Sequence, residues 1–193
     1  MTASKALFGL RPSSRRGGAS NSVAQNQYRI ANGLAQNLFR GDPVKVTLGY
    51  IQRCSATTDF AIGVFQGAEY TDPTTKRPTW TNQWTSGTSV TDGSQPVAMV
   101  NDDANAVVKI QADASVSVGD IGLNFDVTIG AGNATTGASG YGLKASTRKT
   151  TTALLRVRDI YAQPDNAFSD AFPILECIWV QHADYRTSGG ASG

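Results

Sequence analysis

The chain has 193 residues and a formal net charge of +2, which fits a single domain with at most a small appendage. Only 17% of its residues are charged, whereas it contains 20 Thr, 16 Ser and 20 Gly, a composition that excludes a helical bundle. Its 3 Trp, 6 Tyr and 7 Phe are enough for a packed core and exclude wholesale disorder.

Basic residues dominate the N-terminal part of the chain. Residues 1–41 carry six bases and no acid, a charge of +6, and the rest carries 15 acids and 11 bases, a charge of −4. Residues 11–22 are poor in apolar groups and cannot form a core alone. We therefore expect residues 1–25 to be a flexible, extended basic arm, whose cations include Arg11, Arg15 and Arg16.

Such an arm has three interpretations. It can dock on an acidic protein surface, contact the phosphates of nucleic acid, or remain a tail without a specific partner. Arg15 and Arg16 form a single basic pair with no interleaved aromatic residue, and aromatic residues are what stacking on bases requires. A protein partner is therefore favoured, and nucleic acid is not an expected partner.

Beyond the arm, short apolar runs separated by turn signals predict strands over most of the chain. Two runs, 60–65 and 174–180, are almost continuously apolar, which predicts central strands covered on both faces. Around residues 26–39, a helix and a hairpin at Asn32-Gly33 are both compatible with the pattern. Apolar and polar residues alternate, as in half-buried strands, in four further segments: 44–48, 107–112, 124–129 and 155–160.

These elements predict an all-β fold, a compact β-barrel or β-sandwich with long loops and an extended N-terminal arm. The β-rich domain is expected at residues 26–186, and residues 187–193 are expected to be a disordered tail. No segment approaches the roughly 18 apolar residues of a membrane span, and the first residues lack a secretory hydrophobic region. We therefore expect assembly in a cytoplasm and no membrane partner.

Two long loops are predicted, at residues 74–95 and 130–152. The first carries Trp80 and Trp84 in a polar context. Loop tryptophans either fold back onto the domain or serve as anchors at an interface, and both interpretations stay open. Stacking of the two rings on a sugar, as in a carbohydrate-binding module, is a minor alternative.

Groups suited to catalysis or to metal binding do not converge in the sequence. The one histidine, His182, has no nucleophile elbow to serve, and Asp102-Asp103 fits a turn better than a cation site because the EF-hand spacing is missing. Cys54 and Cys177 lack metal-site spacing and are expected to be free and partly buried, with a single disulfide as the alternative. We expect no enzymatic activity, no cofactor and no metal.

The order of several short segments resembles the head decoration (cement) proteins of tailed bacteriophages, over most of residues 9–182. The N-terminal segments that carry this resemblance are Gly9-Leu10-Arg11-Pro12, Tyr28-Arg29-Ile30-Ala31 and Phe39-Arg40-Gly41-Asp42-Pro43-Val44. Further segments follow in the same order: Gly63-Val64-Phe65, Tyr70-Thr71-Asp72, Ala98-Met99-Val100-Asn101-Asp102-Asp103, Ile110-Gln111-Ala112-Asp113, Gly122-Leu123-Asn124-Phe125-Asp126-Val127, Gly132-Asn133-Ala134-Thr135-Thr136-Gly137 and Pro164-Asp165-Asn166-Ala167.

The resemblance implies a β-rich virion protein that binds the outside of an assembled capsid, commonly as a trimer, and bridges neighbouring subunits of the major capsid protein. It implies no catalytic residues. The candidate partner interface rests on the residues alone and comprises Arg11, Arg15, Arg16, Arg29, Trp80 and Trp84. The alternatives are another virion component, in the tail or at the head–tail junction, and the carbohydrate-binding module.

Overall fold

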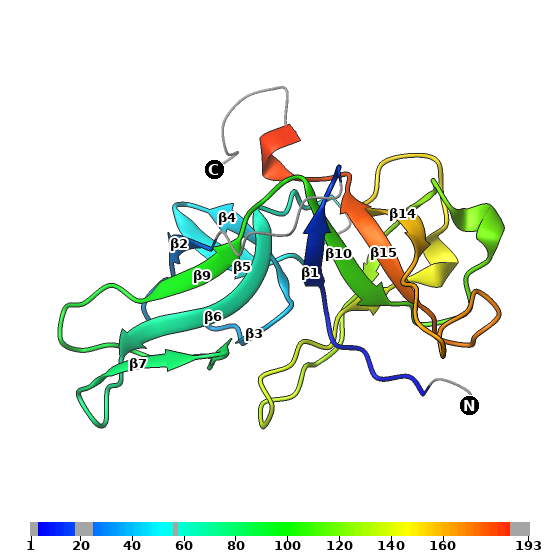
Figure 1. Cartoon of the computed structure of the whole chain (residues 1–193). Coiled ribbons are helices and arrows are strands. Elements are labelled where there is room, and N and C mark those ends of the chain that lie inside the picture. Colours follow the sequence, from blue (N-terminus) through cyan, green and yellow to red (C-terminus); the bar gives the residue numbers. More distant parts are fainter. Residues whose placement is uncertain (1–3, 18–24, 56–57, 186–193) are drawn as a thin grey trace.

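The computed structural model describes residues 4–17, 25–55 and 58–185. Strands make up 42% of the chain and helical residues 5%, so the expected all-β fold is confirmed. The strands form several antiparallel sheets in a sandwich-like arrangement, and the sheets do not close into a barrel. Figure 1 shows two lobes side by side, each built on one large sheet.

The first large sheet has the strand order β1-β10-β15-β14-β11. It consists of β1 (Arg11–Arg15), β10 (Ala106–Gln111), β15 (Ile174–Trp179), β14 (Leu155–Ile160) and β11 (Asn124–Phe125). Burial alternates along β15, where Leu175, Cys177 and Trp179 are buried. Segment 174–180 therefore forms a central strand, but its second face is only half-buried, contrary to the expectation from its apolar run.

The second large sheet has the strand order β2-β9-β6-β4-β5, and β7 pairs with β6 outside this path. Its strands are β2 (Asn26–Arg29), β9 (Val97–Asn101), β6 (Gly63–Thr71), β4 (Pro43–Thr47), β5 (Tyr50–Arg53) and β7 (Pro78–Thr81). The first six residues of β6 are buried, but the predicted run 60–65 overlaps this strand only from Gly63, and Phe60 and Ile62 before it are half-buried. The described chain also contains β3 (Leu38–Phe39), β8 (Gln83–Trp84), β12 (Val127–Thr128), β13 (Gly142–Leu143) and the 3-10 turns η1 (Val118–Asp120), η2 (Ala145–Thr147) and η3 (Ala183–Tyr185).

Two hydrophobic cores are present, one mainly under each large sheet, and the first also takes in Val64 of β6 from the second sheet. The core of the first sheet includes Cys54 and Cys177, which are buried and free, as expected. Burial raises the pKa of both thiols well above the ordinary value, so neither is a thiolate at neutral pH. The core of the second sheet includes Ile30, Leu34 and Leu38, which lie in and beside short strands and not on a helix.

The N-terminal segment differs from the expected flexible arm. Residues Arg11–Arg15 form β1, which pairs antiparallel with β10, and the buried Leu10 anchors its start. The segment lacks apolar residues, but an unpaired edge of β10 offers main-chain donors and acceptors that a polar strand satisfies equally well. The rest of the expected arm beyond residue 17 and most of the expected tail lie outside the described residues.

A buried carboxylate joins segments that are distant in sequence. Asp42 is fully buried; its Oδ2 accepts a hydrogen bond from the Phe39 amide at 2.9 Å and lies 3.4 Å from Arg53 Nε. The Ser139 hydroxyl also hydrogen-bonds to Asp42, and burial nevertheless raises the pKa of this carboxyl group. We call Asp42, Arg53 and Ser139 the Asp42 hub.

The N-terminal segment packs directly onto this hub. The Leu10 amide donates to the Gly41 carbonyl at 2.8 Å, and the Gly9 amide donates to the Tyr141 carbonyl at 2.9 Å. A Cβ atom on Gly9 would lie 2.5 Å from the Gly41 oxygen, and Gly9 has a φ of +77°. Only glycine fits this position, because both the contact and the left-handed backbone exclude a side chain.

Replacement of Asp42 tests the hub. Asp42→Ala leaves Arg53 without its carboxylate and the Phe39 amide without its acceptor, so we expect the free energy of unfolding to fall by about 3 kcal/mol. Urea unfolding of the variant measures this loss. Asp165→Ala, at an exposed aspartate, is the matched control and should change the free energy by less than about 0.5 kcal/mol. Equal effects of the two substitutions would contradict the role of the hub.

His182 provides a pH-dependent test of the packing between the lobes. Its imidazole is fully buried, 5.7 Å from the Trp179 and Tyr185 rings, and its main chain forms a bridge with Ala61. Burial lowers its pKa from the ordinary 6.5, so the unfolded chain binds the proton more tightly. Stability is therefore fully present above this ordinary value and is lost as the pH falls toward the lowered pKa.

We expect the wild type to lose thermal stability over the acidic window that opens as the pH falls below the ordinary pKa of 6.5, because His182 must remain neutral when buried. His182→Gln should be less stable at neutral pH but should show a flatter pH profile in this window. Melting temperatures of both proteins across the window measure the difference. Parallel profiles would show that His182 does not carry the dependence.

Candidate interaction surface

The candidate arginines are dispersed, and two of them fasten β1 to its own sheet. Arg15 pairs with Asp103, with an Nε–Oδ2 distance of 2.5 Å, and the Arg16 guanidinium donates to the Trp179 carbonyl at 3.3 Å. Arg11 is half-buried, and burial together with the charge of Arg40 lowers its pKa. Arg29 is exposed on β2, in the other sheet. The structure therefore does not gather these four cations into one patch.

The two candidate tryptophans lie on strands, and only one is on the surface. Trp84, in β8, is fully buried and meets the Tyr70 ring edge-on with centroids 5.3 Å apart. Trp80, in β7, is 58% exposed. A Cβ atom on Gly67 would lie 2.7 Å from the Trp80 ring, so the glycine lets this ring lie close to β6. The segment that was expected to be a polar loop thus contains two short strands, β7 and β8, which pair with different neighbours. The Trp80 and Trp84 rings do not form a common surface on which a ligand could stack.

A buried aspartate fixes a surface turn that the sequence analysis did not single out. Asp120 in η1 is 1% exposed, and its Oδ2 accepts hydrogen bonds from the Ser117 amide at 2.8 Å and from the Ser117 hydroxyl at 3.0 Å. Arg148 Nη2 donates to the same oxygen at 2.8 Å. The Gly122 amide donates to the Val157 carbonyl at 2.9 Å, which ties the turn to β14.

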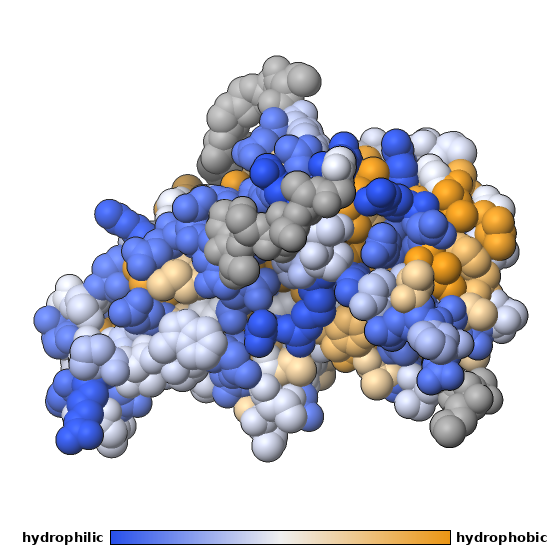
Figure 2. Space-filling view, in the orientation of Figure 1, coloured by the Kyte–Doolittle hydropathy of each residue, from blue (hydrophilic) through white to orange (hydrophobic). Residues whose placement is uncertain are grey.

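This fixed turn presents two aliphatic side chains to solvent. Val118 is 64% exposed and Ile121 is 42% exposed, and we call them the η1 apolar pair. Figure 2 shows hydrophobic surface gathered on the lobe of the first sheet, including the region of η1, whereas the visible face of the other lobe is mostly hydrophilic. An exposed apolar group on a rigid support is suited to protein binding, because little freedom is lost on docking.

A second exposed aliphatic residue lies at the turn between β4 and β5. Leu48 is 77% exposed and has a φ of +51°, and the next residue, Gly49, has a φ of +83°. The sequence pattern places Leu48 at the end of a strand over 44–48, whereas β4 ends at Thr47 and Leu48 belongs to the turn. The glycine at position 49 was the available signal for this turn.

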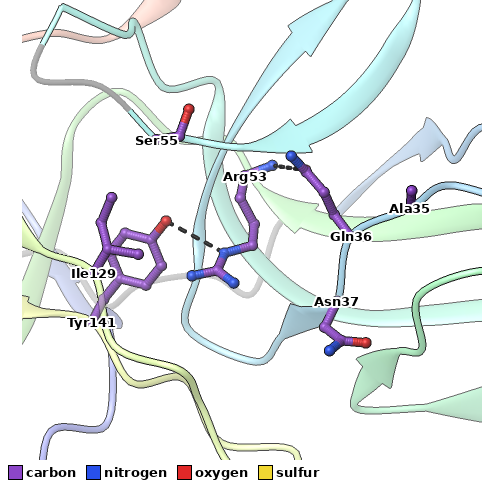
Figure 3. Close-up of a pocket in the computed structure, with 7 residues that line it drawn as sticks. All are labelled: Ala35, Gln36, Asn37, Arg53, Ser55, Ile129 and Tyr141. Carbon is purple, nitrogen blue, oxygen red and sulfur yellow. Dashed lines mark hydrogen bonds between the residues drawn. The ribbon is translucent and has the colours of Figure 1, made fainter.

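A cavity of about 360 Å³ lies beside the C-terminal end of β5 and is shown in Figure 3. Arg53 contributes to its wall, and its guanidinium donates to the Tyr141 hydroxyl at 3.4 Å and to the Gly130 carbonyl at 3.3 Å. Burial raises the pKa of Tyr141 to about 12, so its hydroxyl stays protonated. The cavity is lined by Ala35, Gln36, Asn37, Arg53, Ser55, Ile129 and Tyr141.

Asp102 and Asp103, which the sequence analysis weighed as possible cation ligands, are bound to other side chains of the fold. Asp102 accepts hydrogen bonds from Asn26 and from the Tyr28 hydroxyl, the latter at 2.7 Å, and Asp103 pairs with Arg15. Within residues 4–17, 25–55 and 58–185, no three His, Cys, Asp or Glu side chains gather as metal ligands would. None of the helical segments described has the length and apolarity to span a bilayer.

Comparisons with protein families, with curated proteins and with solved structures found no match. The structure defines an all-β protein with exposed apolar groups in separate places, which include the η1 apolar pair on one lobe and Leu48 on the other.

Substitution of Asp120 tests the support of the η1 apolar pair. Asp120→Ala leaves the Ser117 amide and Arg148 without their acceptor, so we expect a loss of about 2 kcal/mol in the free energy of unfolding. Arg148→Ala should cost less than about 1 kcal/mol, because Arg148 is half-exposed and water screens its charge. Urea unfolding of both variants gives the comparison, and a larger loss for Arg148→Ala would contradict this assignment.

Proposed function

We propose that the protein is a non-enzymatic structural protein of a phage virion, which binds the outer surface of the assembled capsid and stabilises the head. The resemblance to head decoration proteins supports this proposal, and main-chain hydrogen bonds join several of its segments in the fold. Residues Phe39-Arg40-Gly41-Asp42 contact Leu10 through the Gly41 carbonyl. The Arg40 amide also donates a hydrogen bond to the Gly137 carbonyl at 2.9 Å.

The observation that carries the proposal is the η1 apolar pair on its rigid support. An isolated protein gains nothing from holding Val118 and Ile121 in water, whereas a partner surface that buries them gains hydrophobic free energy. Because Asp120, Ser117 and Arg148 already fix the turn, binding requires little ordering of this segment. The partner proposed for this surface is the major capsid protein.

Binding of this kind stabilises a capsid through mass action. A protein that binds only the assembled shell lowers the free energy of that state and leaves dissociated subunits unaffected. Bridging of neighbouring subunits needs more than one contact point on the bound protein. The η1 turn is hydrogen-bonded to β14 of the first sheet, and Leu48 lies in the β4–β5 turn of the second, so the proposed decoration protein has exposed apolar groups for more than one neighbour.

Co-sedimentation with empty, expanded capsids of the parent phage tests the proposal. We expect saturable binding at a fixed ratio to the major capsid protein, and no binding to free DNA at physiological salt. A low, ring-like copy number would instead indicate a tail or head–tail component. The absence of any binding to capsids would overturn the proposal.

A charged variant identifies the surface that binds. Val118→Asp/Ile121→Asp places two carboxylates where apolar burial is expected, so its affinity for capsids should fall at least tenfold. Ser115→Asp adds a carboxylate at an exposed position of the same loop and should bind as the wild type does. Circular dichroism checks that both variants remain folded. Wild-type affinity of the double variant would show that another surface binds the capsid.

A further inference from the structure

The cavity beside the C-terminal end of β5 has two side-chain amides in its wall, those of Gln36 and Asn37. Gln36 Oε1 accepts a hydrogen bond from the Arg53 amide at 3.3 Å, and Asn37 Oδ1 accepts one from the Ser86 amide at 2.7 Å. These bonds assign the oxygen and the nitrogen of each side-chain amide. Neither NH2 group donates a hydrogen bond in the part of the chain that the structure describes, so both are available to a ligand.

The rest of the wall combines a cation with apolar surface. Arg53 contributes its guanidinium and Ser55 a hydroxyl, whereas Ala35, Ile129 and the Tyr141 ring supply the apolar part (Figure 3). Among the described residues that line the cavity, none is Asp or Glu. A wall of donors and one cation, with an apolar side and no acid, suits an anion that carries an apolar group.

The Arg53 guanidinium is held in place but keeps capacity for a ligand. Its Nε lies 3.4 Å from Asp42 Oδ2 and 3.4 Å from the Tyr141 hydroxyl, and its Nη2 donates to the Gly130 carbonyl at 3.3 Å. Charge-assisted hydrogen bonds of this kind are ordinarily about 2.7–2.9 Å long, and a guanidinium carries more N–H donors than these contacts use. The Arg53 Cζ also lies 5.1 Å from the centroid of the Tyr141 ring, a cation–π contact that keeps the group against the wall.

The acids that contact residues of the wall do not turn an anion away. The Asp42 side chain is 1% exposed, whereas that of Arg53 is 18% exposed, and Asp42 does not line the cavity. A ligand therefore meets the cation and not its partner carboxylate. Asp59, which accepts a hydrogen bond from the Ser55 amide, is paired with Lys45 at 2.7 Å, so a cation also matches its charge.

We propose that this cavity binds a small organic carboxylate. The carboxylate group accepts hydrogen bonds from Arg53 and from the NH2 groups of Gln36 and Asn37, and the apolar part of the ligand contacts Ile129 and the Tyr141 ring. The volume of about 360 Å³ falls in the range of pockets for small organic ligands, and an inorganic ion leaves the apolar wall without a partner. This inference goes beyond capsid binding and does not depend on it.

An NMR titration of the isotope-labelled protein with sodium benzoate tests the site. At constant ionic strength, benzoate should shift the side-chain NH2 signals of Gln36 and Asn37 saturably, with a dissociation constant of about 10 mM or lower. Benzamide has the same ring and a similar shape but no charge, so it should bind at least about tenfold more weakly. Equal binding of the two compounds, tighter binding of inorganic phosphate than of benzoate, or the absence of a saturable shift would overturn the proposal.

Asn37→Asp separates the donor from the fold. The new carboxylate still accepts the hydrogen bond from the Ser86 amide, but a charged oxygen replaces the NH2 group, so the affinity for benzoate should fall at least about tenfold. Asn133→Asp is the matched control, because Asn133 Oδ1 also accepts from a main-chain amide, that of Thr135 at 2.9 Å, and Asn133 does not line the cavity. This control changes the net charge equally and should bind benzoate as the wild type does.

Gln36→Glu provides a second test at the other amide. Its carboxylate keeps an acceptor for the Arg53 amide and removes the NH2 donor, so the same loss of affinity is expected. Circular dichroism checks that the variants remain folded. Wild-type affinity in either folded variant would show that benzoate binds elsewhere and would overturn the proposal. Capsid co-sedimentation remains a separate readout, so failure of either proposal is recognised independently.

Discussion

The buried carboxylate of Asp42 is the constraint on which the arrangement of the two lobes depends. It receives a hydrogen bond from Phe39, lies beside Arg53 and contacts Ser139, and these residues belong to different parts of the chain. Its surroundings also exclude a side chain at Gly9. The same carboxylate lies 3.4 Å from Arg53, which lines the cavity beside β5.

Buried aspartates also stabilise loops in the first lobe, where they accept hydrogen bonds and pair with cations. Asp120 fixes the turn at η1, and Asp126 pairs with Lys149 at 2.7 Å. The chain has few charged residues, and these acids are used inside the fold, where they accept hydrogen bonds from amides and cations. This use accounts for the preference for Asp over Glu, because a short side chain reaches the nearby backbone of a turn.

The sequence predicts those parts of the fold that depend on local alternation. Strands β4, β10 and β14 coincide closely in position with predicted segments, although only β14 alternates in burial as predicted, since β10 is buried on both faces and Val46 in β4 is exposed. Strand β1 could not be predicted, because its pairing with β10 depends on main-chain bonds and not on apolar side chains. Trp84 has a polar sequence context, and its burial against Tyr70 depends on a distant strand.

The candidate interaction surface was harder to predict than the fold. The η1 apolar pair stands out only when the burial of Asp120 and the exposure of Val118 and Ile121 are known. Leu48 fits a strand by alternation, and only the backbone angles show that it occupies a turn. Long-range contacts and backbone strain therefore distinguish exposed side chains with a proposed function from those that are exposed by chance.

The central claim is that the turn at η1 faces the capsid. Hydrogen exchange of the free protein and of the capsid-bound protein tests it most directly, because exchange reports on each backbone segment separately. The account predicts slower exchange on binding for amides of residues 117–123, with little change in the central strands β10 and β15. Unchanged exchange at residues 117–123 in a saturated complex would contradict it.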